Sequence, residues 1–365
     1  MGYGNYPPLE KVRRALVIKL RHHGDVLLTS PVFSALKNAL DPDAEIDAYI
    51  YKDTLPMLDG HPAINQFHTY DKSWKKLPYL LCLLRELHLL KMIRSRHYDL
   101  VINLTEGDRG AIVAKTSGAS IRVGIDPGKQ GMKGKKKIFS HLVKNCPTPR
   151  HTVERNLDAL RRIGIFPAED EREIVLHIPG DEKQAISQMV PTSDYIVVHP
   201  VSRWRFKCPP EAFTAELLAA LHERGETVVL TASPDPDELA MCRAICEKNP
   251  HVRIINLAGK TSLKGLSALI ASAKALICVD SVPLHIASAT KTPVVAIFGP
   301  TSEQNWGPWQ HPQAKIISSS HACRPCFLDG CGGSKKSDCL ANLRSSDVLH
   351  ALDSILSKPM NIRQI

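Results

Sequence analysis

Short apolar runs alternate with helical stretches twice along this chain, and this alternation limits the possible folds more than any other feature. The clearest runs are residues 15–20 and 99–104 in the first half, and 195–199 and 275–279 in the second. Apolar runs of this length are typical of buried strands. Strands that alternate with helices form mostly parallel sheets with helices on both faces. The pattern predicts an α/β protein built from two comparable halves.

The length of the chain also favours two domains. At 365 residues it exceeds what one typical core accommodates. We place an N-terminal domain at residues 1–178, a second domain at 179–345, and a C-terminal helix and tail at 346–365. A linker region is expected from about residue 167 to 191, with one short strand at 174–178.

The charge balance indicates anionic partners. The chain has 47 basic and 37 acidic residues and a formal net charge of +10. Such an excess suits phosphorylated substrates, a membrane surface or nucleic acid. The loop at 126–150, rich in Lys and Gly, is a candidate for phosphate contact and equally a solvated loop. Nucleic acid is disfavoured because no basic motif is interleaved with aromatic residues.

Several classes of protein are disfavoured by what the sequence lacks. Neither half carries G-x-G-x-x-G or a Walker A loop, which argues against a nicotinamide dehydrogenase and a P-loop kinase. Residues 1–14 lack the apolar core of a signal peptide, so we expect a cytoplasmic protein with reduced thiols. The apolar stretch at 77–93 is interrupted by charges, and we interpret it as an internal amphipathic helix covering a sheet rather than a membrane segment.

One candidate site lies where the strand at 275–279 ends. Asp280 and Ser281 are good N-cap residues, and Pro283 suits the first turn of a helix. Ligands bind at the carboxyl ends of strands in open α/β sheets, and a helix N-terminus there favours an anion such as a diphosphate. An ordinary capped helix is the alternative.

A second candidate site follows the first strand. His22, His23, Gly24 and Asp25 precede a helical run at 26–40. Gly24 allows a tight turn, and Asp25 can cap the helix. A carboxylate at a strand end can also accept a proton from a hydroxyl group. The two histidines are otherwise simple loop residues.

The loop after the strand at 195–199 is basic. Its hydroxyl group on Ser202 and its ammonium group on Lys207 suit a diphosphate, because Lys207 can neutralise charge without a metal. An exposed basic loop is the alternative. Lys260 and Thr261 lie on another loop at a strand end, where a base or ribose could rest.

Taken in order, these motifs resemble a known family. Gly24-Asp25, Phe206-Lys207-Cys208-Pro209, Val279-Asp280-Ser281 with His285, and Phe298-Gly299-Pro300-Thr301 resemble the bacterial lipopolysaccharide heptosyltransferases of glycosyltransferase family 9. The motifs Arg21-x-His23-Gly24-Asp25-x-Leu27-Leu28-Thr29, Asp99-Leu100-Val101-Ile102-Asn103-Leu104-Thr105 and Val153-Glu154-Arg155-Asn156-Leu157 are similar to heptosyltransferase III. The resemblance runs from about residue 15 to 345.

The resemblance implies a GT-B fold, in which two Rossmann-like domains face each other across a cleft. It implies inverting transfer of heptose from ADP-L-glycero-D-manno-heptose to a heptose of inner-core lipopolysaccharide, with no metal and no cofactor. The partners would be the donor, the nascent lipopolysaccharide core and the inner face of the cytoplasmic membrane, which the enzyme would meet peripherally from the cytoplasm. Nucleic acid is not an expected partner.

The resemblance also implies roles for individual residues. Asp25 is the expected general base, and His23 and Gly24 lie on the acceptor side. The residues expected to bind the donor diphosphate and nucleotide are Ser202, Lys207, Lys260, Thr261, Asp280, Ser281, Val282 and His285. Two positions depart from the family pattern: Val282 replaces a common Gly, and Cys208-Pro209 replaces a common Trp-Pro.

Four cysteines gather near the C-terminus, at Cys323, Cys326, Cys331 and Cys339. Four thiolates could bind zinc. Reduced or surface thiols are the alternative, because the spacing departs from paired zinc knuckles.

Two other functions stay open at this point. The same fold could transfer a sugar to a different acceptor, such as a protein or another glycan. The basic charge also allows a non-catalytic protein that binds an anionic surface or nucleic acid.

Overall fold

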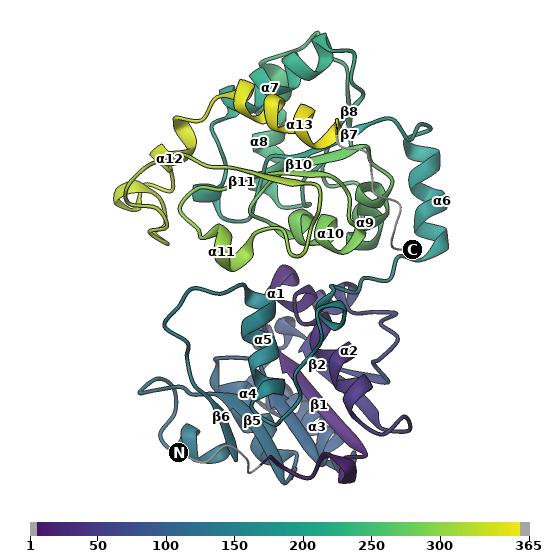
Figure 1. The fold of residues 1–365 in the computed structure, drawn as a ribbon, viewed down its shortest axis with the longest axis vertical. Coiled ribbons are helices and arrows are strands. Elements are labelled where there is room, and N and C mark those ends of the chain that lie inside the picture. The colour runs from purple at the N-terminus through teal and green to yellow at the C-terminus, as the bar shows by residue number, and fades with distance from the viewer. Residues whose placement is uncertain (1–5, 358–365) are drawn as a thin grey trace. The chain divides into compact units, whose positions relative to one another are not determined.

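The computed structural model describes residues 6–357, and the chain divides into two compact units between His177 and Ile178. Each unit contains one six-stranded parallel sheet with helices packed against it (Figure 1). The predicted α/β class is therefore confirmed. The predicted C-terminal helix is present, but the predicted tail after residue 357 lies outside the described residues.

The N-terminal sheet has the strand order β3-β2-β1-β4-β5-β6. Its strands are β1 (Arg14–Lys19), β2 (Glu45–Tyr51), β3 (Gln66–Tyr70), β4 (Leu100–Asn103), β5 (Ile121–Ile125) and β6 (His141–Val143). In the centre, Val17 of β1 lies between Ala48 of β2 and Ile102 of β4. This is the Rossmann order 3-2-1-4-5-6, in which the connections diverge after β1 and β4.

Helices cover both faces of this sheet, while a short helix, α1 (His23–Leu27), follows β1 at its carboxyl end. On one face α2 (Ser30–Ala39) packs against α5 (Thr152–Arg161). On the other face α3 (Tyr79–Ser95) packs against α4 (Asp108–Thr116). Short 3-10 turns connect the elements: η1 (Leu9–Lys11), η2 (Lys52–Met57), η3 (Lys72–Lys76), η4 (Lys135–Ile138) and η5 (Asp170–Arg172).

The C-terminal sheet repeats this topology with the order β12-β11-β10-β7-β8-β9. Its strands are β7 (Ile196–His199), β8 (Val228–Leu230), β9 (Ile254–Asn256), β10 (Ala275–Val279), β11 (Val294–Ile297) and β12 (Ala314–Ile317). The neighbours β7 and β10 correspond to β1 and β4 of the first unit. The connections therefore diverge after β7 and β10.

In the second unit, one face of the sheet is covered by α7 (Glu211–Glu223), α8 (Pro236–Glu247) and α13 (Ser345–Leu356). The other helices are α6 (Gly180–Met189), α9 (Leu263–Ala271) and α10 (Val282–Thr290). Helix α9 packs against both α6 and α10. Two single-turn helices, α11 (Glu303–Trp306) and α12 (Asp338–Ala341), and the turns η6 (Arg205–Lys207) and η7 (Cys331–Gly333) complete the unit. Its core includes Leu218, Leu230, Ile277 and Leu352.

Some predicted elements differ from the structure. The run at 26–40 forms two helices that are separated at Leu28 and Thr29. Residues 174–178 form no strand, and the expected linker contains α6. The edge strands β6 and β12 went unpredicted because short, partly exposed strands carry a weak apolar signal.

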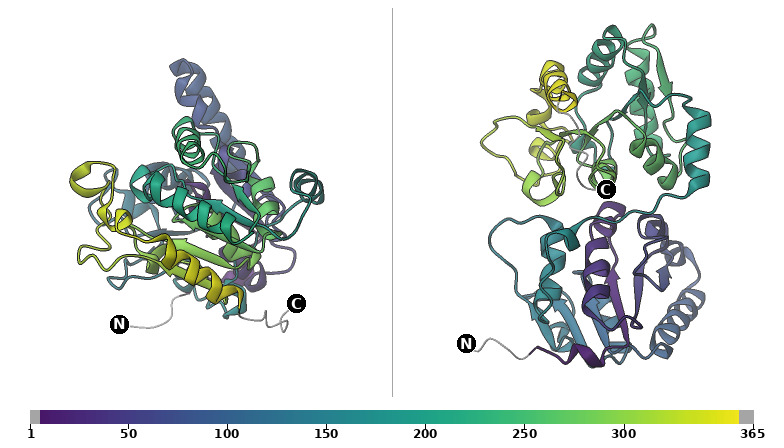
Figure 2. Two further views of the ribbon diagram at one scale, coloured as in Figure 1. Left: turned by 90° about the horizontal axis from the view of Figure 1, so that it is seen from above. Right: turned by 45° about the vertical axis from the view of Figure 1, so that its right-hand side comes forward.

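The largest difference concerns α3, which was predicted as an internal helix. Within the helix only Leu89 and Ile93 are buried, and the apolar side chains of its first half are exposed. In the right-hand view of Figure 2 the helix lies at the side of the N-terminal sheet. Of the helices in residues 6–357, none has the length and apolar character that crossing a membrane requires.

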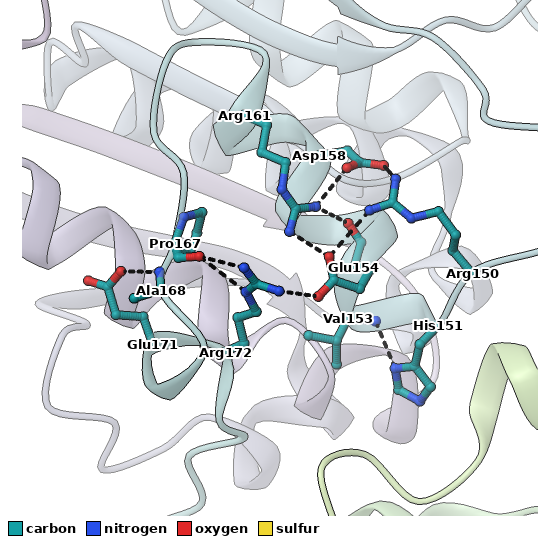
Figure 3. Close-up of polar contacts among 10 residues, drawn as sticks. All are labelled: Arg150, His151, Val153, Glu154, Asp158, Arg161, Pro167, Ala168, Glu171 and Arg172. Atoms are coloured by element: carbon teal, nitrogen blue, oxygen red, sulfur yellow. Dashed lines mark hydrogen bonds and ion pairs between the residues drawn. The ribbon is translucent and has the colours of Figure 1, made fainter.

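An ion-pair network attaches the segment after α5 to that helix (Figure 3). The carboxylate of Glu154 accepts hydrogen bonds from Arg150, Arg161 and Arg172, with Arg172 Nη1 at 3.3 Å. Asp158 binds Arg150 and Arg161 at 2.8 Å each. Burial alone raises the pKa of Glu154, but the hydrogen bond and charge of Arg161, with the other two arginines, outweigh it. The pKa of Glu154 therefore lies below its ordinary value of 4.5.

The replacement Glu154→Gln should destabilise the N-terminal unit. It leaves three arginines without their shared carboxylate, whose side chain is 16% exposed. Exposed pairs are worth up to about 1 kcal/mol and breaking buried ones costs about 3–5 kcal/mol, so we expect a loss of about 2 kcal/mol at pH 7. This corresponds to a fall of roughly 4–8 °C in the midpoint of thermal unfolding. Glu10→Gln, at an exposed site in the same unit, is the matched control.

The difference between wild type and Glu154→Gln should depend on pH in a defined direction. A carboxyl group whose pKa is lower when folded stabilises the folded state above its unfolded pKa, and this stabilisation is lost as pH falls through the folded pKa. The two unfolding midpoints should therefore converge below pH 4.5. A constant difference from neutral to strongly acidic pH would show that the network contributes through packing alone.

Candidate active site

Asp25 lies at the point where the connections of the N-terminal sheet diverge. Helix α1 begins at His23, directly after β1, and its first turn contains Asp25. The N-cap position is His22, so the expectation that Asp25 caps the helix after a tight turn at Gly24 is wrong. Asp25 is partly exposed, while Gly24 is buried. A negatively charged side chain in a first helical turn interacts favourably with the helix dipole.

A buried lysine supports this corner. Lys19 is the last residue of β1, and its Nζ donates to Leu104 O and Asn156 Oδ1, both at 3.2 Å. Asn156 on α5 in turn donates to Leu28 O at 3.0 Å. Burial lowers the pKa of Lys19 to about 8, and the negative charge of Asp25 partly opposes this shift. Lys19 therefore joins β1, the segment directly after β4, and α5 close to the turn that carries Asp25.

Two further contacts fix this turn. The backbone amide of Leu20 donates to Thr105 Oγ1 at 2.7 Å, which ties the loop after β1 to the loop after β4. On the other side, His23 Nε2 lies 2.9 Å from Asp53 O. His23 and Gly24, which the sequence predicts to lie on the acceptor side, are thus held within the N-terminal unit rather than in a free loop.

In the second unit, Lys207 and Asp280 meet where the connections diverge. Lys207 follows β7 at the end of η6, and Asp280 follows β10. Lys207 Nζ lies 2.7 Å from Asp280 Oδ2, and Thr301 Oγ1 donates to the same oxygen at 2.7 Å. Asp280 is buried, whereas the Lys207 side chain is 18% exposed and its Nζ lies 6.0 Å from the Trp306 ring centroid. The buried carboxylate thus orients a lysine at the carboxyl end of the sheet.

The start of α10 lies next to this ion pair. Ser281 occupies the N-cap position without a side-chain capping bond, and its Oγ instead donates to Val279 O at 3.1 Å. Val282 and Pro283 follow as the first helical residues, and His285 is buried in the helix. The sequence suggested that the side chains of Asp280 and Ser281 cap the helix. In the structure neither side chain does so. The positive end of the helix dipole and the Lys207 ammonium group occupy the same corner.

The other predicted donor residues lie on nearby loops. Ser202 is half-buried in the Lys207 loop, and its Oγ accepts from the Trp204 amide at 3.3 Å. Lys260 and Thr261 follow β9, two strands away from β7. Strand spacing puts roughly 10 Å between these strands. Lys260 is exposed and donates to Asn256 O at 2.9 Å, so the structure does not bring it into contact with Lys207.

Sequence reasoning missed four residues that support the two corners. Lys19 had a signal, since a lysine in an otherwise apolar strand needs a buried partner. Thr301 belongs to the motif Phe298-Gly299-Pro300-Thr301, but its bond to Asp280 depends on which strands are neighbours. Ser337 donates to Phe206 O at 2.7 Å and ties the Lys207 loop to the C-terminal segment. His199 ends β7, and burial lowers its pKa to about 4, so it is neutral at pH 7.

The possible zinc site at the four C-terminal cysteines is not supported. Among residues 6–357, no group of three or more His, Cys, Asp and Glu side chains is arranged to hold a metal ion. Cys339 is buried in the hydrophobic core, which raises the pKa of its thiol, while Cys323 and Cys331 are exposed. All ten cysteines lie within the described residues and are free thiols. The four thiols lie in different environments, with Cys339 in the core, Cys326 half-buried, and Cys323 and Cys331 exposed.

Sequence comparisons match most of the chain to one family. The model of glycosyltransferase family 9 (heptosyltransferase) matches residues 87–336. The chain is 33% identical over 341 residues to lipopolysaccharide heptosyltransferase 3 of Escherichia coli, covering 92% of this chain and 97% of that protein. It is 38% identical over 295 residues to lipopolysaccharide heptosyltransferase 3 of the K12 strain, covering 80% and 83%.

Solved structures share the fold. A family 9 glycosyltransferase from Veillonella parvula has a TM-score of 0.80 at 21% identity, covering 97% of this chain and 99% of that chain. The ADP-heptose heptosyltransferase II of E. coli has a TM-score of 0.73 at 23% identity, covering 94% and 98%. These likenesses confirm the predicted GT-B class with two Rossmann-like domains, and the sequence relatives confirm the resemblance to heptosyltransferase III. The chain therefore belongs to glycosyltransferase family 9, the heptosyltransferase family.

Proposed function

We propose that this enzyme transfers heptose from ADP-L-glycero-D-manno-heptose to a heptose of inner-core lipopolysaccharide, with inversion and without a metal. The names of two relatives, both lipopolysaccharide heptosyltransferase 3, support the acceptor class. A structural neighbour of the same fold was solved with ADP. The observation that carries the proposal is the Lys207–Asp280–Thr301 cluster beside the start of α10.

The donor half of the reaction belongs to the C-terminal unit. As the glycosidic bond breaks, negative charge develops on the leaving diphosphate. A lysine and a helix N-terminus at that position stabilise this charge more in the transition state than in the ground state. Ser202, Ser281 and Val282 would contact the diphosphate, and Asp280 would hold Lys207 in place. Lys260, Thr261 and His285 remain candidates for nucleotide contacts.

The acceptor half of the reaction is assigned to the N-terminal unit. In an inverting transfer, a base removes the proton of the acceptor hydroxyl while its oxygen attacks the anomeric carbon from the side opposite the diphosphate. Asp25 suits this role because it is a partly exposed carboxylate on a turn fixed by Lys19 and Thr105. His23 and Gly24 would line the approach of the acceptor sugar.

The place of action follows from the acceptor. Lipopolysaccharide core is built on a lipid, so the acceptor hydroxyl is presented at a membrane surface. We propose that the enzyme acts as a peripheral protein at the inner face of the cytoplasmic membrane and that nucleic acid is not a partner. The net charge of +10 suits an anionic lipid surface.

The replacement Asp25→Asn should lower kcat by about 10²- to 10⁴-fold, the usual contribution of a general base. Donor affinity should be retained, because Asp25 is assigned to the acceptor half. ADP release with ADP-heptose and a truncated core acceptor measures kcat, and calorimetry measures donor binding. Asp43→Asn, an exposed site in the same unit, is the control. Turnover of Asp25→Asn at the wild-type rate would rule out this base.

The replacement Lys207→Met should weaken ADP binding. Loss of charge-assisted hydrogen bonds costs about 1.5–3 kcal/mol, which corresponds to roughly 10- to 100-fold in Kd. Lys274→Met is the matched control, because Lys274 also forms an ion pair, at 2.8 Å with Glu226, but precedes β10 at the opposite end of the strand. Lys207→Met leaves the buried carboxylate of Asp280 without its counter-charge, and adding Asp280→Asn removes that charge. Comparing the single and double variants therefore separates a loss of stability from a loss of ADP binding.

Calorimetry of the wild type against ADP and ADP-heptose, and against UDP and GDP sugars, tests the donor itself. Binding of the adenine nucleotides alone is expected. Preference for UDP or GDP sugars would overturn the donor assignment while leaving the Lys207 prediction intact. A panel of defined protein and glycan acceptors separates the proposed acceptor from others on the same fold.

Chelation should leave the reaction unchanged. Lys207 and the helix start supply the positive charge that a divalent ion provides in other enzymes, so kcat/KM with excess EDTA should equal that without it. Magnesium and manganese should give no stimulation. Activity that EDTA abolishes and a divalent ion restores would contradict the metal-independent mechanism.

A further inference from the structure

Helix α3 presents an apolar face to solvent. Tyr79 is 83% exposed, and Leu80, Leu84 and Leu87 are 65%, 53% and 51% exposed. The large side chains of this helix thus lie outside the core, although sheet-covering helices normally bury such residues. Exposed apolar clusters of this kind mark interaction sites.

The exposed leucines form one stripe. Leu80, Leu83, Leu84 and Leu87 follow the spacing i, i+3, i+4, i+7, which places them on a single helix face. The buried positions Leu89 and Ile93, which belong to the hydrophobic core of the unit, share the opposite face with Glu86 and Cys82. Along its first half, the helix therefore turns its leucines toward solvent and its polar residues toward the sheet.

The inward polar residue has its own partners, which explains this reversal. Glu86 Oε1 accepts from Arg109 Nη2 at 3.0 Å, and Arg109 stacks over the Tyr70 ring with its Cζ 3.9 Å from the centroid. Tyr70 Oη lies 3.4 Å from Glu86. The orientation of α3 is thus fixed by a specific ion pair, and the outward leucines are a consequence of that orientation.

Basic residues surround the apolar stripe. Residues 72–95 contain six lysines and arginines and a single acidic residue, the half-buried Glu86, which is paired with Arg109. Lys75 and Lys76 are exposed directly before the helix. Lys91 and Arg94 are exposed in the last turns of the helix and continue the same helical face. The surface therefore combines leucines with a positive border.

We propose that this face, defined by Leu80, Leu83, Leu84 and Leu87 with its basic border, docks onto a bilayer that contains anionic phospholipid. An interfacial helix lies in the membrane plane with its apolar side among the acyl chains and its basic residues at the phosphates. At 17 residues, α3 is too short and too charged to cross the bilayer. Docking would bring the N-terminal unit to the surface that carries the acceptor, a consequence that rests on the proposed function.

A second copy of the chain suits this face less well. Two copies paired through α3 would bring Lys75, Lys76, Lys91 and Arg94 of both helices close together. Like charges at an interface oppose pairing, whereas phosphate headgroups attract the same residues. The charge pattern thus favours a lipid surface over self-association.

The test uses the full-length protein and sedimentation with vesicles. The wild type should bind vesicles of phosphatidylcholine and phosphatidylglycerol in equal parts, bind phosphatidylcholine vesicles much less, and lose affinity as salt rises. The triple variant Leu80→Ser, Leu84→Ser, Leu87→Ser should bind the anionic vesicles at least about tenfold more weakly. Phe166→Ser, which removes an equally exposed apolar residue of the same unit from outside α3, should bind like the wild type.

The charged border is tested separately with Lys75→Glu, Lys76→Glu, which should lower binding to anionic vesicles and leave the weak binding to phosphatidylcholine unchanged. Circular dichroism and thermal unfolding verify that the variants are folded. Wild-type vesicle binding by the triple variant would overturn the proposal. The proposal would also be overturned if the wild type were a dimer, the triple variant were a monomer, and neither protein bound vesicles. That result would identify a second copy as the occupant.

Activity separates this surface from the proposed chemistry. On a lipid-free core oligosaccharide the triple variant should keep the wild-type kcat/KM, while its transfer to vesicle-borne acceptor should fall in step with vesicle binding. If the wild type binds anionic vesicles but transfers heptose to neither acceptor, the proposed function fails and the docking surface stands. If the triple variant transfers to vesicle-borne acceptor at the wild-type rate, the surface has no part in reaching the acceptor.

Discussion

The contact between Lys207 and Asp280 is the interaction on which the proposed donor site depends. A buried carboxylate requires a counter-charge, because breaking such a pair leaves a desolvated ion. The two residues are 73 positions apart and meet only because β7 and β10 are neighbours in a parallel sheet. Thr301, from the loop after β11, binds the same carboxylate oxygen. Three strand ends thus fix the direction of one ammonium group.

The N-terminal unit uses the same topology with the charges exchanged. Its strand order matches that of the second unit, and Lys19 lies at the corresponding divergence point. There the buried group is a lysine and the partly exposed group is the carboxylate of Asp25. In the second unit the buried group is Asp280 and the partly exposed group is Lys207. In the proposed reaction, one architecture thereby supplies the base from one unit and the cation that stabilises the leaving diphosphate from the other.

This division explains how much the sequence could predict. The central strands were predictable because runs buried on both faces are continuously apolar, and the strand-end loops therefore pointed to Asp25, Lys207 and Asp280. The partner of each charge was not predictable, because the bonds of Lys19 and Thr301 depend on which strands are neighbours. The position of Asp25 inside α1 was also missed, since several residue types can begin a helix. The four C-terminal cysteines left zinc open for a similar reason: the sequence does not show that Cys339 belongs to the core.

Helix α3 shows a further limit of periodicity. The pattern identifies which residues share a face, but it does not determine which face turns inward. Here the Arg109–Glu86 pair, stacked on Tyr70, anchors the polar side against the unit, so the leucines face out. Exposure of these leucines to water has a cost in free energy that the fold alone does not recover. A second environment that accepts leucines and lysines together would offset that cost, and an anionic lipid surface has both properties.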